Sequence, residues 1–265
     1  MFEEIYEKEF GVRDVLTKTW LVYCKRFKAI STMMLIVSLP GIIINYLVLD
    51  NIVDKLNHLT SSATLLLVVV IIVEITVGAL ISFMGLVGIS LIVEDTVKED
   101  GNKINWETVL NKVFSKLPSY IGTNLLATLI LFGLSLLFVI PGIIWNLYYI
   151  FITQVVFLRE IGGKDALDYS KSLVKGRWWK VFWILVVIGL INMAVSFGTG
   201  VISFFLPGIF QAILTTCVDA VACVFFIACQ TILFLNLDYL NKKNKNATME
   251  LDGDLEKEPQ EIVIR

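Results

Sequence analysis

Long apolar runs separated by charged segments dominate the chain. Two formal charges, Glu74 and Asp219, are the only ones within six such runs, which cover residues 29–49, 64–93, 120–140, 142–158, 181–206 and 208–235. A helix needs about 20 apolar residues to cross about 30 Å of hydrocarbon. The pattern therefore predicts an all-α integral membrane protein with six transmembrane helices.

The charged segments predict how the chain lies in the membrane. With six spans, all but one of the 22 Lys and Arg residues fall on the same side, in residues 1–28, 94–119, 159–180 and the segment after residue 236. The exception is Lys55, in the first loop on the other side. Because cytoplasmic loops carry the excess of Lys and Arg, we expect both termini to be cytoplasmic.

A short amphipathic stretch precedes the first, third and fifth spans. The apolar face of the first consists of Val12, Val15, Leu16, Tyr23 and Phe27, and the cations on or beside its polar edge are Lys18, Lys25, Arg26 and Lys28. The second has the helical spacing Trp106, Val109, Leu110, Val113, Phe114 and Leu117, and the third begins at Asp165. Such helices bury one face among lipid headgroups and offer cations to anionic lipid. We therefore expect the bilayer, with anionic lipid at its cytoplasmic face, to be a partner.

The tripeptide Pro-Gly-Ile occurs three times, beginning at Pro40, Pro141 and Pro207. Proline removes a backbone donor and glycine permits a reversal, so the second and third copies predict tight turns at the outer surface. Pro40 lies midway through the first span, where we expect a kink. The prediction is three hairpins, each preceded by a cytoplasmic interfacial helix.

Composition divides the chain into three parts. Residues 1–28 form the first interfacial helix, and residues 29–240 form the six-span membrane domain. Residues 241–265 are rich first in Lys and Asn and then in acidic residues. Because low hydrophobicity and high charge are typical of disorder, we expect a disordered cytoplasmic tail.

The polar residues inside the predicted spans are the candidate site. Counted from the start of their runs, Glu74 and Asp219 reach a similar depth, and Gln154 and Asn192 could complete a polar layer. An ionisable side chain in hydrocarbon is costly and often marks an ion or substrate path. Two other interpretations are a neutral acid that is hydrogen-bonded to the next helix and an assembly interface. The structural interpretation is the one we favour.

The remaining composition excludes several classes of protein. A mean hydropathy of +0.78, with 57% apolar residues, is too high for a soluble core, which excludes a soluble enzyme and a nucleic-acid binder. The single histidine, His58, and four cysteines without a CxxC pair predict no metal site and no cofactor. The cysteine positions also argue against a secreted disulfide scaffold.

The segment from Pro141 to Phe182 resembles a known family. Its pattern places Pro-Gly before an aromatic-rich span and a Glu at the inner end, and then Ala-Leu, Ser, Gly and Trp, which here are Pro141, Gly142, Glu160, Ala166, Leu167, Ser170, Gly176 and Trp178 or Trp179. This is similar to the membrane domain attached to some bacterial glycerophosphoryl diester phosphodiesterases, and to its stand-alone membrane relatives. The resemblance implies a six-helix protein in the cytoplasmic membrane of a bacterium or archaeon. It implies no phosphodiesterase activity, because in that family the activity belongs to a separate soluble barrel.

Three functional hypotheses follow. The leading one is a non-enzymatic multi-pass membrane protein that acts through partner proteins or lipids, in an accessory, anchoring or envelope role, with a homo-oligomer as one possibility. The second is a transporter or channel component in which Glu74 and Asp219 line a path. The third is a self-immunity protein against a membrane-active peptide. An intramembrane enzyme is the least expected, because the two acids have no His or metal partner in the spans.

Overall fold

The computed structural model describes residues 2–33, 61–98, 106–137, 139–206 and 208–255, and all regular structure in these ranges is helical. The all-α class predicted from the sequence is therefore confirmed for this part of the chain. In chain order the elements are the 3₁₀ turn η1 (Glu3–Tyr6) and the helices α1 (Val12–Lys25), α4 (Ser61–Lys98), α5 (Trp106–Leu137), α6 (Val139–Tyr148), α7 (Ile152–Leu158), α8 (Gly163–Val174), α9 (Trp178–Ser203) and α10 (Gly208–Leu255).

Among the described residues, four helices are long and apolar enough to cross a membrane. The candidate segments are Gly78–Lys98 in α4, Glu107–Leu134 in α5, Trp178–Ser203 in α9 and Ile213–Met249 in α10. These helices support a membrane protein. Most of the first predicted span, including Pro40, lies outside the described residues.

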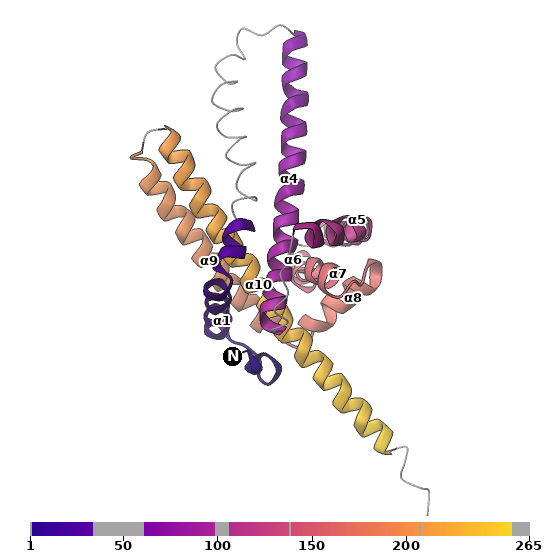
Figure 1. Ribbon diagram of the computed structural model, residues 1–265. Helices are drawn as coiled ribbons and strands as arrows, with labels where there is room; N and C mark the ends of the chain where they lie inside the picture. Colours follow the sequence, from indigo (N-terminus) through magenta and orange to yellow (C-terminus); the bar gives the residue numbers. More distant parts are fainter. Residues whose placement is uncertain (1, 34–60, 99–105, 138, 207, 256–265) are drawn as a thin grey trace, which may run out of the picture.

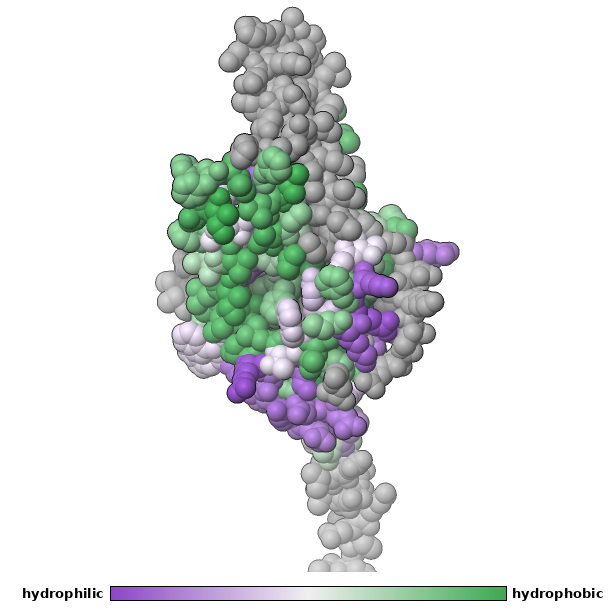
Figure 2. Space-filling model, turned by 60° about the vertical axis from the view of Figure 1, so that its left-hand side comes forward, coloured by the Kyte–Doolittle hydropathy of each residue, from purple (hydrophilic) through white to green (hydrophobic). Residues whose placement is uncertain are grey.

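Helices α9 and α10 form a hairpin and lie side by side in Figure 1. The chain turns between them, where the backbone N–H of Leu206 donates to the carbonyl of Ser203 at 3.0 Å, just before the predicted Pro-Gly turn. The outer flank of α9 exposes large apolar side chains, including Leu190, Met193, Phe197 and Ile202. Figure 2 shows an apolar surface above a polar zone, which is the arrangement expected where hydrocarbon meets a headgroup region.

The amphipathic stretch before the third predicted span is not a separate helix. α5 runs unbroken from Trp106 to Leu137 and therefore includes both the stretch and most of the apolar run. Pro118 lies inside this helix. Extending a formed helix adds one hydrogen bond per residue, whereas a second helix needs a new nucleus, and the stretch has no glycine at which the helix would end.

The fourth predicted span, residues 142–158, consists of two helices rather than one. α6 begins at Val139, so Pro141 and Gly142 lie in its first turn and not in the turn that precedes it. Proline is tolerated there because the first backbone N–H groups of a helix have no partner within it. The chain leaves the helical conformation after α6 and enters it again at the start of α7.

Side chains of α8 and α10 satisfy the backbone at this break. Ser170 Oγ donates to the carbonyl of Tyr148 at 2.7 Å and accepts from the N–H of Phe151 at 3.3 Å. Gln230 Nε2 donates to the carbonyl of Ile150 at 2.8 Å. Interrupted helices persist at membrane depth where neighbouring side chains satisfy the freed groups. The break is therefore a supported feature of the fold.

The N-terminal segment is docked against α10. Asn236 is 1% exposed, and its Oδ1 accepts from the N–H of Phe10 at 2.9 Å. Its Nδ2 donates to the carbonyls of Ile5 and Lys8 at 2.9 and 2.8 Å. One side chain therefore satisfies three backbone groups of a segment more than 220 residues away in the sequence, beside the buried side chains of Phe2, Ile5 and Phe10.

The inner face of α1 packs against other helices, whereas Phe27, a member of the apolar face predicted to meet lipid, is 55% exposed. Helix α1 packs against α4, α9 and α10, and its buried residues are Val15, Thr19 and Val22. Two of the cations predicted to meet lipid are in ion pairs, Lys18 with Glu4 at 3.1 Å and Arg26 with Asp95 at 2.8 Å.

The sequence predicts disorder after residue 240, whereas the structure is helical as far as Leu255. α10 continues to that residue, and residues 242–249 are exposed on it. An existing helix extends without a new nucleus, and the Lys, Ala, Met, Glu and Leu residues here are good helix formers. The last ten residues of the predicted tail lie outside the described residues.

Substituting Asn236 with Ala should release the N-terminal segment. The change leaves the buried backbone groups of Phe10 and Ile5 unpaired, at about 1–3 kcal/mol for each unsatisfied group, and also frees the part-buried carbonyl of Lys8. We expect a lower free energy of unfolding in a denaturant titration, together with faster proteolysis after Lys8. Asn241→Ala is the control on the same helix, since Asn241 makes one exposed hydrogen bond of 3.5 Å. Equal stability of the two variants would contradict the docking.

Candidate functional site

The residues of the predicted polar layer lie in four different helices, α4, α7, α9 and α10. Glu74 lies in α4, and its side chain is outside the described residues. Gln154 is 1% exposed in α7. Asp219 is exposed on α10 and accepts a hydrogen bond of 3.1 Å from Ser196 Oγ on α9. In the part of the chain that the structure describes, no hydrogen bond joins Gln154, Asn192 and Asp219 to one another.

A buried ionic cluster lies near the ends of α4 and α7, against the middle of α10. Arg159 Nη1 donates to Glu94 Oε1 at 2.5 Å, and Nε donates to Asp238 Oδ2 at 2.9 Å. Arg159 Nη2 also lies 2.7 Å from Asp238 Oδ2. Asp238 is fully buried, and the side chain of Arg159 is 11% exposed. One guanidinium at the end of α7 therefore connects α4 to α10.

Further side chains complete the cluster. The hydroxyl of Tyr169 on α8 donates to Asp238 Oδ1, and Lys242 lies 3.0 Å from Asp238 Oδ2. Lys98 lies 2.9 Å from Glu94. Both carboxylates therefore face several donors. Among the described residues, no group of three or more His, Cys, Asp or Glu side chains could hold a metal ion.

The cluster keeps Arg159 and Tyr169, which lie outside the predicted spans, in their protonated forms. Burial acts to lower the pKa of Arg159, but the hydrogen bonds and charges of Asp238 and Glu94 outweigh it and raise that pKa. Burial, together with the hydrogen bond to Asp238, raises the pKa of the Tyr169 hydroxyl. A fixed cation and a fixed donor beside two carboxylates suit a structural connection between helices.

Sequence reasoning missed this cluster although a signal was present. Glu94, Arg159 and Asp238 are the first charged residues after the apolar runs 64–93, 142–158 and 208–235. All three runs are predicted to cross in the same direction, so these residues share one membrane boundary. Their opposite signs could have suggested that they pair.

Glu160 and Gly176, two positions of the family pattern, have left-handed backbone conformations. Glu160 has φ +60° just after α7, and Gly176 has φ +82° between α8 and α9. Glu160 also pairs with Lys116 at 3.0 Å and with Lys112 at 3.4 Å. The hydrogen bond from Lys116 and the charge of Lys112 hold the pKa of Glu160 below its usual value. This residue therefore fastens the end of α7 to α5.

The other described positions of the family pattern pack the same region. Ala166 and Leu167 are buried on α8, beside Ser170, which satisfies the helix break. Trp178 Nε1 donates to the carbonyl of Ile144 at 3.4 Å, which joins α9 to α6. These residues therefore have structural roles at the broken helix.

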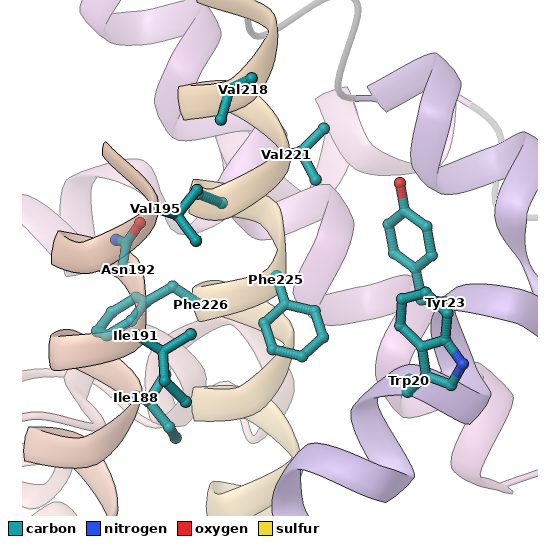
Figure 3. A pocket seen from close by; sticks show the side chains of 11 residues that line it. Trp20, Tyr23, Ile188, Ile191, Asn192, Val195, Val218, Val221, Phe225 and Phe226 are labelled. Atoms are coloured by element: carbon teal, nitrogen blue, oxygen red, sulfur yellow. The ribbon is translucent and has the colours of Figure 1, made fainter. Parts of the chain in front are cut away.

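A hollow opens between α1 and the α9–α10 hairpin. Its volume is about 420 Å³, within the range of about 300–1,000 Å³ that is usual for small-ligand sites. Figure 3 shows side chains that line it from the three helices. The lining residues are Trp20, Tyr23, Ile188, Ile191, Asn192, Val195, Val218, Val221, Ala222, Phe225 and Phe226. We call this hollow the α1–α9–α10 groove.

Most of the groove surface is hydrocarbon. The aromatic pair Trp20 and Tyr23 on α1 stacks at 6.0 Å between ring centroids and faces α10 in Figure 3. The opposite walls are aliphatic or Phe side chains, and Asn192 supplies one amide. A surface of this kind suits a flexible apolar ligand rather than an ion.

A second hollow, of about 430 Å³, lies where the N-terminal segment meets the start of α9. Glu9 occupies it, with Oε2 at 2.8 Å from Lys180 Nζ and the other oxygen paired with Arg177. The hydrogen bond from Lys180 and the charge of Arg177 hold the pKa of Glu9 below the ordinary value of 4.5. The two cations therefore fasten the N-terminal segment to α9.

Replacing Arg159 with Met should destabilise the protein strongly. Removing one partner of a buried ion pair leaves uncompensated charge and costs about 3–5 kcal/mol. We expect this loss in the free energy of unfolding by denaturant titration, and a smaller loss when Glu94→Gln and Asp238→Asn accompany it. Arg13→Met, at an exposed arginine, is the control. If Arg159→Met and Arg13→Met had equal stability, the cluster would not connect the helices.

The contribution of Glu9 should depend on pH. Because the folded pKa of Glu9 is lowered, its contribution is complete above the unfolded value near 4.5 and disappears as the pH falls through the folded pKa. The wild type should have a higher thermal midpoint than Glu9→Gln at about pH 7, and the difference should vanish toward about pH 3. Glu7→Gln, at an exposed glutamate, should show no such difference at either pH. A difference between wild type and Glu9→Gln that grew on acidification would contradict the assignment.

In comparisons with protein-family models, curated proteins and solved structures, no match to this chain was found.

Proposed function

We propose that this chain is a non-enzymatic, multi-pass protein of the cytoplasmic membrane that acts through lipids or partner proteins. The observation that carries the proposal is the α1–α9–α10 groove, because its apolar walls suit a hydrocarbon ligand. The exposed apolar flank of α9 adjoins it, so the groove would be reached from within the bilayer. The buried ionic cluster has a supporting role, since it anchors α10, which forms one wall of the groove, to α4 and to the end of α7.

The proposal includes six spans with both termini in the cytoplasm. Ion pairs that link the charged segments to one another support it. Glu9 pairs with Lys180, Arg26 pairs with Asp95, and Arg159 joins two further segments. Charged segments in direct contact belong on one side of a membrane, and the excess of Lys and Arg on that side favours the cytoplasm.

We also propose that the chain is related to the membrane domain of bacterial glycerophosphoryl diester phosphodiesterases and its stand-alone relatives. The residues that carry the resemblance support it, because Glu160, Ser170 and Trp178 all stabilise the region of the broken helix. A bacterial or archaeal source is part of this proposal. The relation adds no catalytic activity to the proposed function.

One observation favours transport as a second candidate. Asp219 is an exposed acid within an apolar hairpin, and its described hydrogen bond comes from Ser196. An acid placed in this way often belongs to an ion path. The two functions make opposite predictions about ion flux.

Purified protein in sealed liposomes should carry no proton or K⁺ flux above that of empty liposomes. The Glu74→Gln, Asp219→Asn double variant should behave in the same way, because the proposed function does not use these carboxyls as a path. Valinomycin added at the end of each trace confirms that the vesicles were sealed. Flux that requires the two carboxyls would overturn the proposal in favour of a transporter.

A further inference from the structure

The α1–α9–α10 groove extends through the apolar part of the hairpin. On α9 its lining runs from Ile188 to Val195, which lie ten and seventeen residues after the first residue of the helix. At about 1.5 Å per residue, these positions are about 15 and 25 Å from that end. With α9 crossing the membrane, this part of the groove lies at hydrocarbon depth. Acyl chains are the molecules that surround a protein there.

The walls of the groove match the chemistry of an acyl chain. Aliphatic residues of α9 and α10 and the two rings Phe225 and Phe226 form its surface. The aromatic pair on α1, Trp20 and Tyr23, lies on the other side. Aromatic residues of this type concentrate where hydrocarbon meets the headgroups. The groove therefore combines an apolar channel with an aromatic wall from α1.

Two cations, one in α1 and one just after it, favour an anionic ligand in the groove. Arg13 lies two helical turns before Trp20 on nearly the same helix face, and Lys28 lies eight residues after it. Both are exposed, and among the described residues neither is in an ion pair. Basic residues near a membrane surface attract anionic headgroups. The charge beside the groove therefore complements an anionic lipid.

We propose that the α1–α9–α10 groove binds one acyl chain of an anionic phospholipid, with its headgroup toward the cytoplasmic face and attracted by the basic residues in and just after α1, of which Arg13 and Lys28 lie on either side of the aromatic pair in the chain. Asn192 contributes an amide to the lining, and Trp20 and Tyr23 contribute an indole and a phenol. The inference deepens the proposed function and rests on it, because it names the lipid through which the protein acts. It also gives α1 a role in lipid binding although the inner face of that helix contacts protein.

The test uses the full chain reconstituted in nanodiscs that contain equal parts of phosphatidylglycerol and phosphatidylcholine. After transfer to mild detergent, native mass spectrometry measures the fraction of protein that retains one lipid and identifies the headgroup. We expect wild-type protein to retain a single phosphatidylglycerol in preference to phosphatidylcholine. Retention of neither lipid, or of both equally, would overturn the inference.

Two substitutions fill the groove from opposite walls. Ala222→Trp on α10 and Val195→Trp on α9 should each lower the fraction with bound phosphatidylglycerol by about tenfold, which corresponds to about 1.4 kcal/mol. Ala194→Trp is the matched control, because Ala194 is exposed on α9 and does not line the groove. Circular dichroism and thermal unfolding identify any variant that is misfolded, and Val195 is itself partly exposed, so its replacement should be tolerated.

Charge reversal tests the position of the headgroup. Arg13→Glu with Lys28→Glu should reduce the preference for phosphatidylglycerol over phosphatidylcholine by about tenfold, since basic residues near an anionic surface contribute on this scale. Lys243→Glu with Lys245→Glu makes the same change in net charge on the exposed extension of α10, away from the groove, and should have no effect. Equal effects of the two pairs would overturn the proposed headgroup position.

The outcomes separate this inference from the proposed function. If both groove-filling variants retained as much lipid as the wild type, the groove would not be the binding site. The same conclusion would follow if Ala194→Trp lost as much lipid as they do. A dimer that the groove-filling variants dissociate would show that a second copy occupies it. Either result, with silent liposomes in the flux assay, would leave the proposed function in place. Flux that depends on Glu74 and Asp219 would overturn the proposed function itself.

Discussion

The double ion pair of Arg159 is the interaction on which the rest of the structure depends. Its guanidinium lies between Glu94 at the end of α4 and Asp238 on α10, and Tyr169 of α8 donates to the same Asp238. Charged groups can be buried this deeply only when each has a partner. The pairing therefore fixes where four helices meet, and this arrangement in turn positions the docked N-terminal segment through Asn236, two residues before Asp238.

A membrane adds a second constraint, on the backbone polar groups in the outer part of the bundle. In hydrocarbon, every backbone polar group needs a partner inside the protein. The break between α6 and α7 obeys this requirement through Ser170 and Gln230, which satisfy the backbone of the interrupted helix. Apolar surface has no such requirement, so the hairpin of α9 and α10 can expose its flank and leave a groove open beside α1. Lipid is the occupant that we propose for that groove.

Several features could be predicted from the sequence because they depend on local patterns. Length and apolarity predict α9 and α10 as helices able to cross a membrane. The sequence also predicts a reversal between them, and the described backbone turns there at Leu206. The ionic cluster and the docking by Asn236 depend on residues that are far apart in the chain, and no periodicity reveals which of them meet. Of the apolar face predicted for α1, Val15 is buried and Phe27 is exposed, because amphipathicity does not say which part of a face protein covers. The break after α6 could not be predicted, because its partners come from α8 and α10.

The central claim is that the charged segments form one layer on the cytoplasmic side. Cross-linking tests it most directly, with cysteines in place of Glu9 and Lys180 in a chain whose four native cysteines have been replaced. A short, membrane-impermeant bifunctional thiol reagent is added separately to inverted and to right-side-out membrane vesicles. The account predicts a cross-link in the inverted vesicles, where the cytoplasmic face is outside, and none in right-side-out vesicles. A cross-link only in right-side-out vesicles, or no cross-link in either, would contradict it.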